Sequence, residues 1–452
     1  MDEEKEKEEL ELRQIIDASD SRRLAEYIDG REAIDFAQTV SLIDDDDILR
    51  HLLMLMDDDE LAALMEESED KMRLRIARLL NDHRLLVAFE YMQKDDIVDM
   101  LGDFPIGRRK KVINLMKADD QRVINKLLDY PEDSAGGIMT TEYIALKYNL
   151  TILDSLRKIQ EIGPKTEVIE TIYVIDDRRR LIGWVDLRDL LSAPKETVLK
   201  NIMEENPITV YPEIDQEETA RIVRKYDLMS LPVVSRSNQI LGIITVDDII
   251  DVIVDEYDED MLQMAGVSGE ESLDTTLKES VRFRLPWLMV NLATAFLASF
   301  TVKIFQGTIE QVVALSAIMT IVSGMGGNAG SQTMSILVRQ LAQGDLSFKQ
   351  VIKPFRKEIM LSLIDGGSTG LVTAVIVSAV YGNIYLGIIT LVAMIGNMLV
   401  SGIFGFLVPL VLKKCKADPA VASSIFVTTA TDVLGFFIFL GLANVFLPFL
   451  IK

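Results

Sequence analysis

The sequence is poor in the side chains that bind soft metals. It has one cysteine, Cys415, and two histidines, His51 and His83, among 452 residues. A single cysteine excludes a disulfide framework and a Cys-based zinc site, and two histidines exclude a His-rich metal site. Any metal bound by this chain therefore has oxygen ligands, which favours a hard cation such as Mg²⁺ or Ca²⁺.

Basic residues are scarce relative to acidic ones, 47 against 71, and the formal net charge is −24. A chain this acidic is a poor binder of nucleic acid, because phosphate contacts require clustered Lys and Arg. Its charge favours cation binding instead. The acid is unevenly spread, since residues 1–281 carry a net charge of −30 and residues 282–452 carry +6.

The C-terminal part contains five apolar runs, each long enough to cross a bilayer as a helix of ~20 residues. They lie at 285–305, 311–338, 359–381, 384–412 and 420–450. The alternative, that all five runs are buried core helices of a soluble domain, is disfavoured because they lie so close together in the chain. Lys and Arg gather in the loops after the second and fourth runs, which predicts that these loops are cytoplasmic. We therefore expect five spans with the N-terminus inside and the C-terminus outside, and no signal peptide before them.

Residues 138–253 contain an internal repeat with a period of about 60 residues, which favours a tandem pair of small domains. Ile138-Met139-Thr140 recurs as Ile202-Met203-Glu204, and LIGWVDLRDL at 181–190 recurs as ILGIITVDDI at 240–249. These segments resemble a pair of cystathionine-β-synthase (CBS) domains. The resemblance implies a regulatory α/β module and makes ATP a candidate ligand, with Arg188 and Asp189 at matching positions.

Short amphipathic helices are predicted over 11–130, where they favour a small superhelix, and an acidic helix is predicted over 247–262. The chain is thus expected to be a multidomain membrane protein. Its parts are a disordered N-terminus (1–10), an acidic all-α superhelical domain (11–132), tandem α/β CBS domains (133–246), an acidic connecting helix with its linker (247–281) and an all-α transmembrane domain of five helices (282–452).

Two features inside the apolar runs are costly in a membrane. The second run contains GMGGNAGSQ at 324–332, whose glycines and polar side chains fit either a hydrated pathway or a tight helix–helix seam. The fifth run carries Asp432 beside three threonine hydroxyls, Thr428, Thr429 and Thr431, which suit a hydrated cation. An intramembrane carboxylate is a functional-site hypothesis by default. For Asp365 in the third run, we expect a hydrogen-bonded role facing the bundle.

The acidic residues of the predicted cytoplasmic part offer a second kind of candidate site. Asp95 and Asp99 are four residues apart on one predicted helix, where like charges repel unless a cation lies between them. The helix over 247–262 carries a larger acidic track. An ordinary solvated acidic surface and a cation sensor both fit these patterns, and divalent cations would relieve the repulsion of a −30 segment.

The order of these parts resembles the MgtE family of magnesium channels over residues 11–452. The most specific motifs are GGNAGSQ at 326–332 and Asp418-Pro419-Ala420 followed by Asp432. The resemblance implies a homodimer in the plasma membrane, surrounded by lipid, with a pore on its two-fold axis. It assigns Gly326, Gly327, Asn328 and Thr428 to the ion pathway and Asp432 of both subunits to a hydrated Mg²⁺.

The resemblance also implies that cytoplasmic Mg²⁺ closes the pore by bridging the N-terminal domain, the CBS pair and the connecting "plug" helix. The acids at matching positions are Asp95, Asp99, Glu217, Asp227, Asp248, Asp251, Glu256, Glu259, Asp260 and Asp418. An enzyme is disfavoured, because the spans lack a nucleophile–base pair and a catalytic metal cluster. Transport of Co²⁺ or Mn²⁺ and a membrane-tethered nucleotide sensor that transports nothing are the alternatives.

Overall fold

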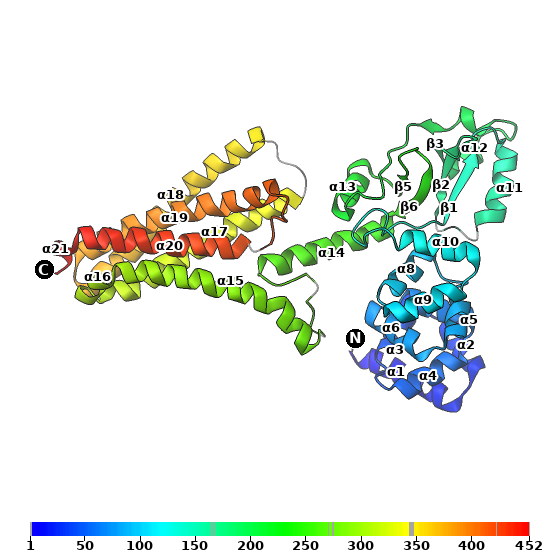
Figure 1. The fold of residues 1–452 in the computed structure, drawn as a ribbon, viewed down its shortest axis with the longest axis horizontal. Coiled ribbons are helices and arrows are strands. Elements are labelled where there is room, and N and C mark those ends of the chain that lie inside the picture. The colour runs from blue at the N-terminus through cyan, green and yellow to red at the C-terminus, as the bar shows by residue number, and fades with distance from the viewer. Residues whose placement is uncertain are drawn as a thin grey trace. The chain divides into compact units, whose positions relative to one another are not determined.

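The computed structural model describes residues 2–163, 166, 168–269, 271–273, 275–342, 348–421 and 423–451. It divides into two compact units, Met1–Val252 and Ile253–Lys452 (Figure 1). The N-terminal unit begins with a run of short helices. They are α1 (Asp2–Ala18), α2 (Ser21–Asp29), α3 (Ala33–Ser41), α4 (Asp46–Leu55), α5 (Asp58–Glu66), α6 (Asp70–Leu79), α7 (Asp82–Ala88), α8 (Lys94–Gly102), α9 (Ile106–Leu115) and α10 (Ala118–Leu127).

These helices form the expected superhelix, because most of them pack against the helix two places along the chain, as α3 does on α5 and α5 on α7. Acidic residues start several of them. The Asp45 carboxylate accepts a hydrogen bond from the Asp47 backbone N–H at 2.8 Å, and Asp57 with Glu60 forms a capping box on α5. Helix α1 begins at Asp2, within the stretch for which disorder is expected, and the Glu and Lys residues there have high helix propensity.

Three arginines tie successive turns of the superhelix together. The Arg75 guanidinium donates to the backbone oxygens of Ile43 at 2.6 Å and Asp44 at 2.5 Å, in the connection between α3 and α4. In the same way, Arg84 reaches the oxygen of Met56, and Arg108 reaches the oxygen of Ala77 at 2.5 Å. Each bond spans about thirty residues and satisfies a carbonyl group near a helix terminus.

The repeat forms two small sheets with helices. The elements are β1 (Tyr143–Lys147), α11 (Ile152–Ile162), β2 (Val168–Ile175), β3 (Leu181–Asp186), α12 (Leu187–Ser192), the 3₁₀ helix Leu199–Asn201, β4 (Glu204–Glu205), α13 (Gln216–Tyr226), β5 (Ser230–Val234) and β6 (Ile240–Thr245). One sheet has the order β1-β2-β3-β4, with β1 and β2 parallel, and the other pairs β5 with β6 antiparallel.

The two copies of the repeat exchange their first segments. Thr140 of the first copy pairs with Ile243 of the second, and Glu204 of the second copy pairs with Trp184 of the first. Two glycines make this exchange possible. A Cβ on Gly242 would lie 2.5 Å from the Thr140 oxygen, and one on Gly183 would lie 2.6 Å from the Glu204 oxygen. Each copy is therefore completed by its partner copy.

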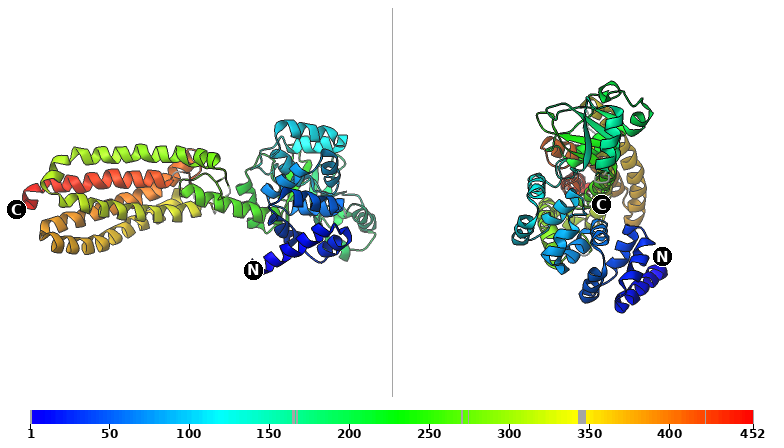
Figure 2. Two further views of the ribbon diagram at one scale, coloured as in Figure 1. Left: turned by 90° about the horizontal axis from the view of Figure 1, so that it is seen from below. Right: turned by 90° about the vertical axis from the view of Figure 1, so that its right-hand side faces the viewer.

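The C-terminal unit is a bundle of long helices that run side by side (Figures 1 and 2). The acidic helix expected at 247–262 is α14 (Val246–Met264), which continues from the first unit into the second. It is followed by α15 (Leu277–Ile304), α16 (Gln306–Gln311), α17 (Ala314–Ala342), α18 (Phe348–Tyr381), α19 (Ile384–Lys414), α20 (Ser423–Val445) and α21 (Leu447–Leu450).

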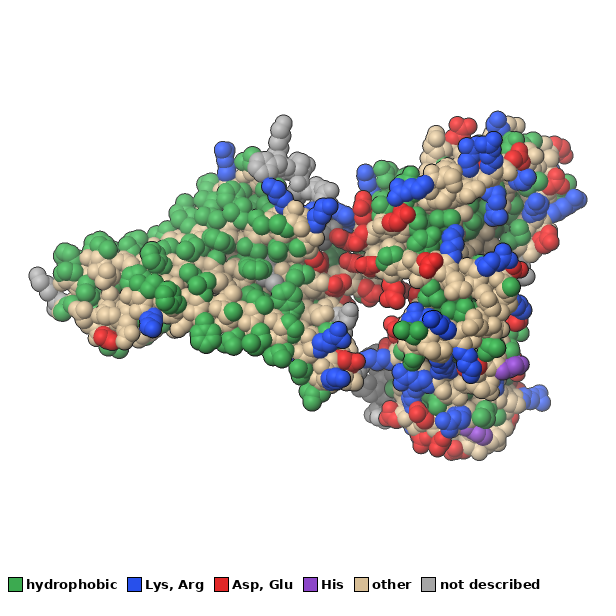
Figure 3. Space-filling view, viewed as in Figure 1, with side chains coloured by type: hydrophobic (Ala, Val, Ile, Leu, Met, Phe, Trp, Pro, Cys, Tyr) green, Lys and Arg blue, Asp and Glu red, His purple; other side chains and the backbone are tan. Residues whose placement is uncertain are grey.

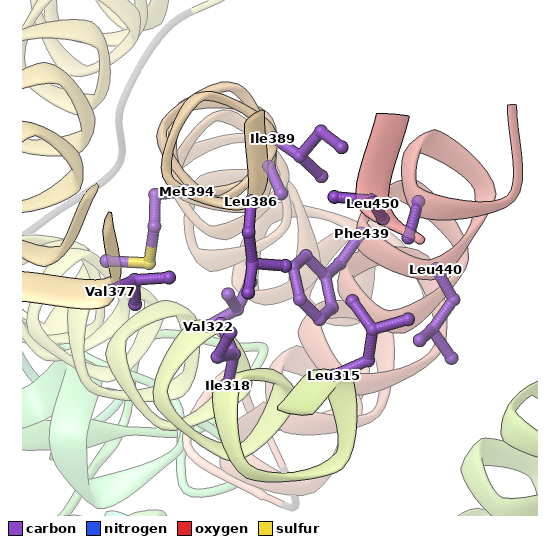
Figure 4. Close-up of a cluster of buried hydrophobic side chains, with 12 residues drawn as sticks. Leu315, Ile318, Val322, Val377, Leu386, Ile389, Met394, Phe439, Leu440 and Leu450 are labelled. Atoms are coloured by element: carbon purple, nitrogen blue, oxygen red, sulfur yellow. The ribbon is translucent and has the colours of Figure 1, made fainter. Parts of the chain in front are cut away.

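The centre of this bundle is α19, which packs against α17, α18 and α20. An apolar cluster at one end of the bundle joins α17, α19 and α20 through Leu315, Leu386 and Phe439 (Figure 4). Large apolar side chains such as Phe296 and Phe300 cover the outside of the unit (Figure 3). An apolar exterior of this extent is typical of a surface that contacts lipid.

Within the described residues, four helices are long and apolar enough to cross a membrane, namely α15, the Val351–Tyr381 part of α18, α19, and the Ser424–Val445 part of α20. Helix α17 has 29 residues, which is ample length. It is not among the four, because the glycine-rich polar motif at 324–332 lowers its apolar content. Apolar content alone therefore does not identify α17 as a fifth span.

Candidate ion pathway and acidic cluster

Asp432 lies on α20 and faces the neighbouring helix α17. The Ser323 hydroxyl on α17 donates a hydrogen bond to Asp432 Oδ1. This hydroxyl was not anticipated from the sequence, because it lies outside the glycine motif and 109 residues from Asp432. This hydrogen bond satisfies one acceptor of a carboxylate that is otherwise unfavourable inside a membrane. It also joins α17 and α20, the two candidate pathway helices, at the level of Asp432.

The glycine motif on α17 divides between two faces of the helix. Gly326 and Gly330 face other helices, since a Cβ on Gly326 would lie 2.2 Å from Asn397 Nδ2 and one on Gly330 would lie 2.4 Å from a Val427 methyl group. By contrast, Gly324 and Gly327 have nothing within 4 Å of an added Cβ. The helix-seam interpretation therefore fits Gly326 and Gly330, whereas Gly324 and Gly327 lie on an open face of α17.

The open face of α17 carries a polar stripe, which consists of Thr320, Gly324, Asn328 and Gln332 at successive four-residue intervals. All four residues are exposed in the single chain. Four-residue spacing places them above one another on one side of the helix. A stripe of this polarity is poorly suited to lipid, so it suits a hydrated path or a second copy of the chain.

The three threonines near Asp432 differ in what their hydroxyls do. Thr429 donates to the Ile425 oxygen at 2.6 Å, and Thr431, which is fully buried, donates to the Thr428 oxygen at 2.9 Å. Only Thr428 of the three is exposed, and it lies one turn before Asp432 on the same face. Asp365 is also exposed. The expectation that it faces the bundle is wrong, because Gly366 rather than Asp365 contacts α19.

A second group of acidic residues surrounds α8 in the N-terminal unit. The pKa of Asp95 is raised to about 7, first by burial and then by the neighbouring carboxylates of Asp96 and Asp248. Burial also raises the pKa of Asp96 to about 6, although Arg73 at 3.7 Å opposes the shift. The pKa of Asp99 is raised too, first by burial of its carboxylate and then by Asp95 and Asp96, although part of the side chain is open to solvent.

Residues from three other segments complete this acidic cluster. The pKa of Glu66 is raised, mainly by burial, and so is that of Glu142, and both carboxylates interact with Asp95. Asp248 at the start of α14 has a raised pKa for the same reason, and it accepts a hydrogen bond from the Thr245 hydroxyl at 2.5 Å. Sequence reasoning missed Glu66 and Glu142, since nothing in their local pattern distinguishes them from other surface acids.

Of the remaining predicted acids, one lies beside the acidic cluster and the others lie outside it. Asp251, on α14, lies close enough to raise the pKa of Asp248. Glu217 lies in the first turn of α13 and Asp227 is its C-cap. Ten residues of helix put these two about 15 Å apart, so one chain cannot use both for one ion.

The acids of the second unit are also spread out. Glu256, Glu259 and Asp260 lie on the part of α14 beyond Val252, and Figure 3 shows acidic side chains gathered along α14. The Asp418 carboxylate accepts a hydrogen bond from the Ala420 backbone N–H at 2.8 Å.

The chemistry of the acidic cluster fits a hydrated cation better than a directly ligated one. No group of three or more His, Cys, Asp or Glu side chains in the described ranges has the arrangement of a metal site. Asp95 Oδ1, however, is buried without a hydrogen-bond partner among the described atoms. Mg²⁺ keeps several of its waters in proteins, and such waters could reach carboxylates that are too far apart to bind one ion directly.

Arg188 and Asp189, the positions that resemblance assigns to a nucleotide, lie in the first turn of α12. Both side chains are exposed, and the Arg188 backbone N–H donates to the N-cap residue Asp186 at 2.7 Å. The Asp186 cap fixes the start of α12, and the two side chains are open to a ligand.

An apolar helical bundle with an intramembrane carboxylate, attached to an acidic superhelix and a CBS pair, is typical of membrane transport proteins. Comparison with family models agrees. Residues 319–442 match the divalent cation transporter domain MgtE, residues 31–133 match the MgtE intracellular N domain, and residues 135–196 and 199–255 match CBS domains.

Individual relatives cover most of the chain. The magnesium transporter MgtE of Bacillus subtilis (strain 168) is 30% identical over 384 residues, which cover 85% of each chain. That of Enterococcus faecalis (strain ATCC 700802 / V583) is 33% identical and covers 73% of this chain and 72% of the relative. The solved cytosolic domain of the Mg²⁺ channel MgtE in complex with ATP is 29% identical, covers 54% of this chain and 99% of that one, and has a TM-score of 0.51.

This chain belongs to the MgtE family. It is therefore a membrane protein with an intracellular N-terminal domain and tandem CBS domains. Its relatives are transporters, so the expectation that the chain is not an enzyme is confirmed.

Proposed function

We propose that this chain transports Mg²⁺ across the plasma membrane into the cytoplasm, and that cytoplasmic Mg²⁺ closes it. The observation that carries the proposal is Asp432, an intramembrane carboxylate that Ser323 holds in place on α20. Thr428 lies on the same face, and the relatives are named magnesium transporters. A carboxylate with adjacent hydroxyls binds a hydrated ion through its waters, which suits an ion that dehydrates reluctantly.

The proposal includes a homodimer with five spans in each chain and the C-terminus outside. Helix α17 would be the fifth span, because its 29 residues extend about 43 Å and it packs against α19 and α20. In a dimer the polar stripe Thr320, Gly324, Asn328 and Gln332 would face the pathway with Gly327, while Gly326 supports it from behind. Two-fold symmetry would turn one Asp432 into two carboxylates. The domain boundaries after residues 10, 132, 246 and 281 stay predictions.

Mg²⁺ is favoured over Co²⁺ and Mn²⁺ by the oxygen-only character of the pathway residues. Softer ions gain from imidazole and thiolate ligands, and the chain's Cys415 and two histidines all lie outside the spans. Oxygen ligands also accept Mn²⁺, so competition experiments must decide between these ions.

Closure by Mg²⁺ would act through the acidic cluster. Asp95 and Asp248 repel each other when both are ionised, and a hydrated Mg²⁺ would reverse that repulsion. The further acids Asp99, Glu217, Asp227, Asp251, Glu256, Glu259, Asp260 and Asp418 would contribute sites in the same way. ATP would bind near Arg188 and Asp189 of the CBS pair, as supported by the ATP complex of the related cytosolic domain.

The transport proposal is tested by Mg²⁺ uptake into liposomes that contain the purified full-length protein. We expect Asp432→Ala and Asp432→Asn to lower the initial rate at least about tenfold, because the ionised carboxylate is lost in a low-dielectric site. Asp365→Asn is the matched control, since it removes an exposed carboxylate from a different span, and its rate should stay within about twofold of wild type.

Two outcomes would reject the proposal. Equal rates for wild type and Asp432→Ala would remove Asp432 from the pathway. No cation uptake by the wild type, together with tight adenine-nucleotide binding, would instead support the membrane-tethered nucleotide sensor. Uptake of Mn²⁺ or Co²⁺ that Mg²⁺ does not compete with would change the substrate but keep the pathway.

A further inference from the structure

A single buried amide, Asn397 of α19, lies between the two helices that carry the candidate pathway. Its side chain is only 1% exposed, and its Nδ2 donates to the Val322 backbone oxygen of α17 at 2.7 Å. One turn further along α19, the buried Ser401 hydroxyl donates to the Gly326 oxygen at 2.6 Å. Helix α19 thus holds α17 at two successive turns by side-chain hydrogen bonds.

The same amide also contacts α20. A Cβ on Gly435 of α20 would lie 2.5 Å from Asn397 Oδ1, just as a Cβ on Gly326 of α17 would lie 2.2 Å from Asn397 Nδ2. Only glycine at these two positions lets both helices approach one side chain so closely. Asn397 is therefore in direct contact with both pathway helices.

These contacts occur at the level of Asp432. Val322 immediately precedes Ser323, which donates to Asp432, and Gly435 follows Asp432 by three residues, or about one turn. Asn397 Oδ1 has no hydrogen-bond partner among the described atoms, and an unsatisfied buried acceptor is unfavourable for stability. An apolar residue would avoid that cost but would lose the Nδ2 bond to Val322, which joins α19 to α17.

We propose that Asn397 is a positioning residue for the ion pathway. By contacting α17 at Val322 and Gly326 and α20 at Gly435, it fixes the spacing of the two helices and so the placement of the Asp432 carboxylate relative to Ser323. Its effect on flux rests on the proposed transport function, whereas its effect on helix spacing does not.

A mutant cycle between Asn397 and Gly435 tests this role in the liposome uptake assay. We expect Gly435→Ala to lower Mg²⁺ flux about tenfold, because the new methyl group collides with the amide, and Asn397→Ala to lower it about fivefold. The double variant should also be lowered only about fivefold, since no amide remains for the methyl group to displace. A loss of about fiftyfold in the double variant, the product of independent effects, would overturn the proposal.

The control is Thr390→Val on the same helix. Thr390 is fully buried, but its hydroxyl donates to Leu386 of its own helix at 2.8 Å. This substitution removes a buried polar group whose hydrogen bond lies within α19 and does not reach α17 or α20. Its flux should remain within about twofold of wild type, and a loss equal to that of Asn397→Ala would overturn the specific role of Asn397.

A distance measurement separates positioning from transport. Nitroxide labels are placed at the exposed positions Ile321 of α17 and Leu434 of α20, in a Cys415→Ser background. Labelled chains are diluted with unlabelled ones, so that distances within one chain dominate. Asn397→Leu, which has a similar size but no donor, should shift or broaden the distance distribution and lower the flux.

Lower flux with an unchanged distribution would overturn the positioning role. A shifted distribution in a protein whose wild type carries no Mg²⁺ would keep the positioning role and reject the transport function.

Discussion

Asp95 and Asp96 show how single carboxylates can link protons, cations and stability. Burial raises their pKa values to about 7 and about 6, whereas an unfolded Asp has a pKa of about 3.9. Between about pH 4 and pH 7 the folded protein therefore holds protons that the unfolded chain has lost. Stability is then highest below this window and falls as pH rises through it, because folding must keep ionised carboxylates together.

We predict that the thermal unfolding midpoint of the cytoplasmic unit, measured in full-length protein with EDTA, falls between about pH 5 and about pH 8. Millimolar Mg²⁺ should raise the midpoint more at the higher pH, where the acids are ionised and can bind a cation without releasing protons. Asp95→Asn should flatten the pH dependence. A midpoint that is independent of pH in EDTA, or a Mg²⁺ effect of equal size at both pH values, would contradict this prediction.

At the scale of whole elements, the superhelix depends on long side chains that connect helices two places apart. Arg75 is the clearest case, since its guanidinium binds two backbone oxygens between α3 and α4 and lies 2.8 Å from the Asp46 carboxylate. Lys cannot replace this arrangement, because an ammonium group lacks the planar fork that reaches several acceptors at once.

We therefore predict that Arg75→Lys weakens the connection between α3 and α4 by about 2 kcal/mol. Amide hydrogen exchange in the segment 43–49 should then accelerate by roughly tenfold or more. Arg78→Lys is the control, because Arg78 lies on the same helix with an exposed side chain, and exchange in that segment should not change. Similar exchange in the two variants would show that the Arg75 bonds contribute little.

The elements themselves were largely predictable from the sequence, because they follow from local patterns. Apolar runs predicted the long helices, and recurrence of LIGWVDLRDL as ILGIITVDDI predicted the CBS pair. The partners of the key carboxylates were not predictable in this way. Ser323 lies 109 residues from Asp432, and Glu66 meets Asp95 only because α5 and α8 belong to one superhelix. Such pairs depend on how helices pack against each other, and the periodicity of a single segment does not encode that packing.

At the scale of the whole molecule, the net charge differs between the N-terminal part and the membrane part. The N-terminal 281 residues carry −30 and the membrane part carries +6, so in the proposed mechanism a cytoplasmic cation would act on the first part of the chain and a transported cation on the second. A ligand shifts such an equilibrium only through a difference in its affinity for the two states. In the proposed mechanism, acids that approach each other only in the closed state would supply that difference for Mg²⁺.

We predict that neutralising Asp95, Asp248 and Asp251 together raises the cytoplasmic Mg²⁺ concentration for half-inhibition of flux by at least about tenfold. The control neutralises three exposed acids elsewhere in the same unit, Asp17, Glu161 and Glu196, and changes the net charge equally. If both triple variants shift inhibition alike, the effect is one of overall charge, and the assignment of the acidic cluster as sensor fails.

The exchange of segments between the CBS copies has a consequence for biosynthesis. Thr140 finds its strand partner only when Ile243 has been made, about 100 residues later. At a synthesis rate of ~5–20 residues per second, the first copy waits on the ribosome for roughly 5–20 s with an unpaired edge. The superhelix that precedes it can fold during that interval, and the first apolar span leaves the ribosome soon after the two copies close on each other.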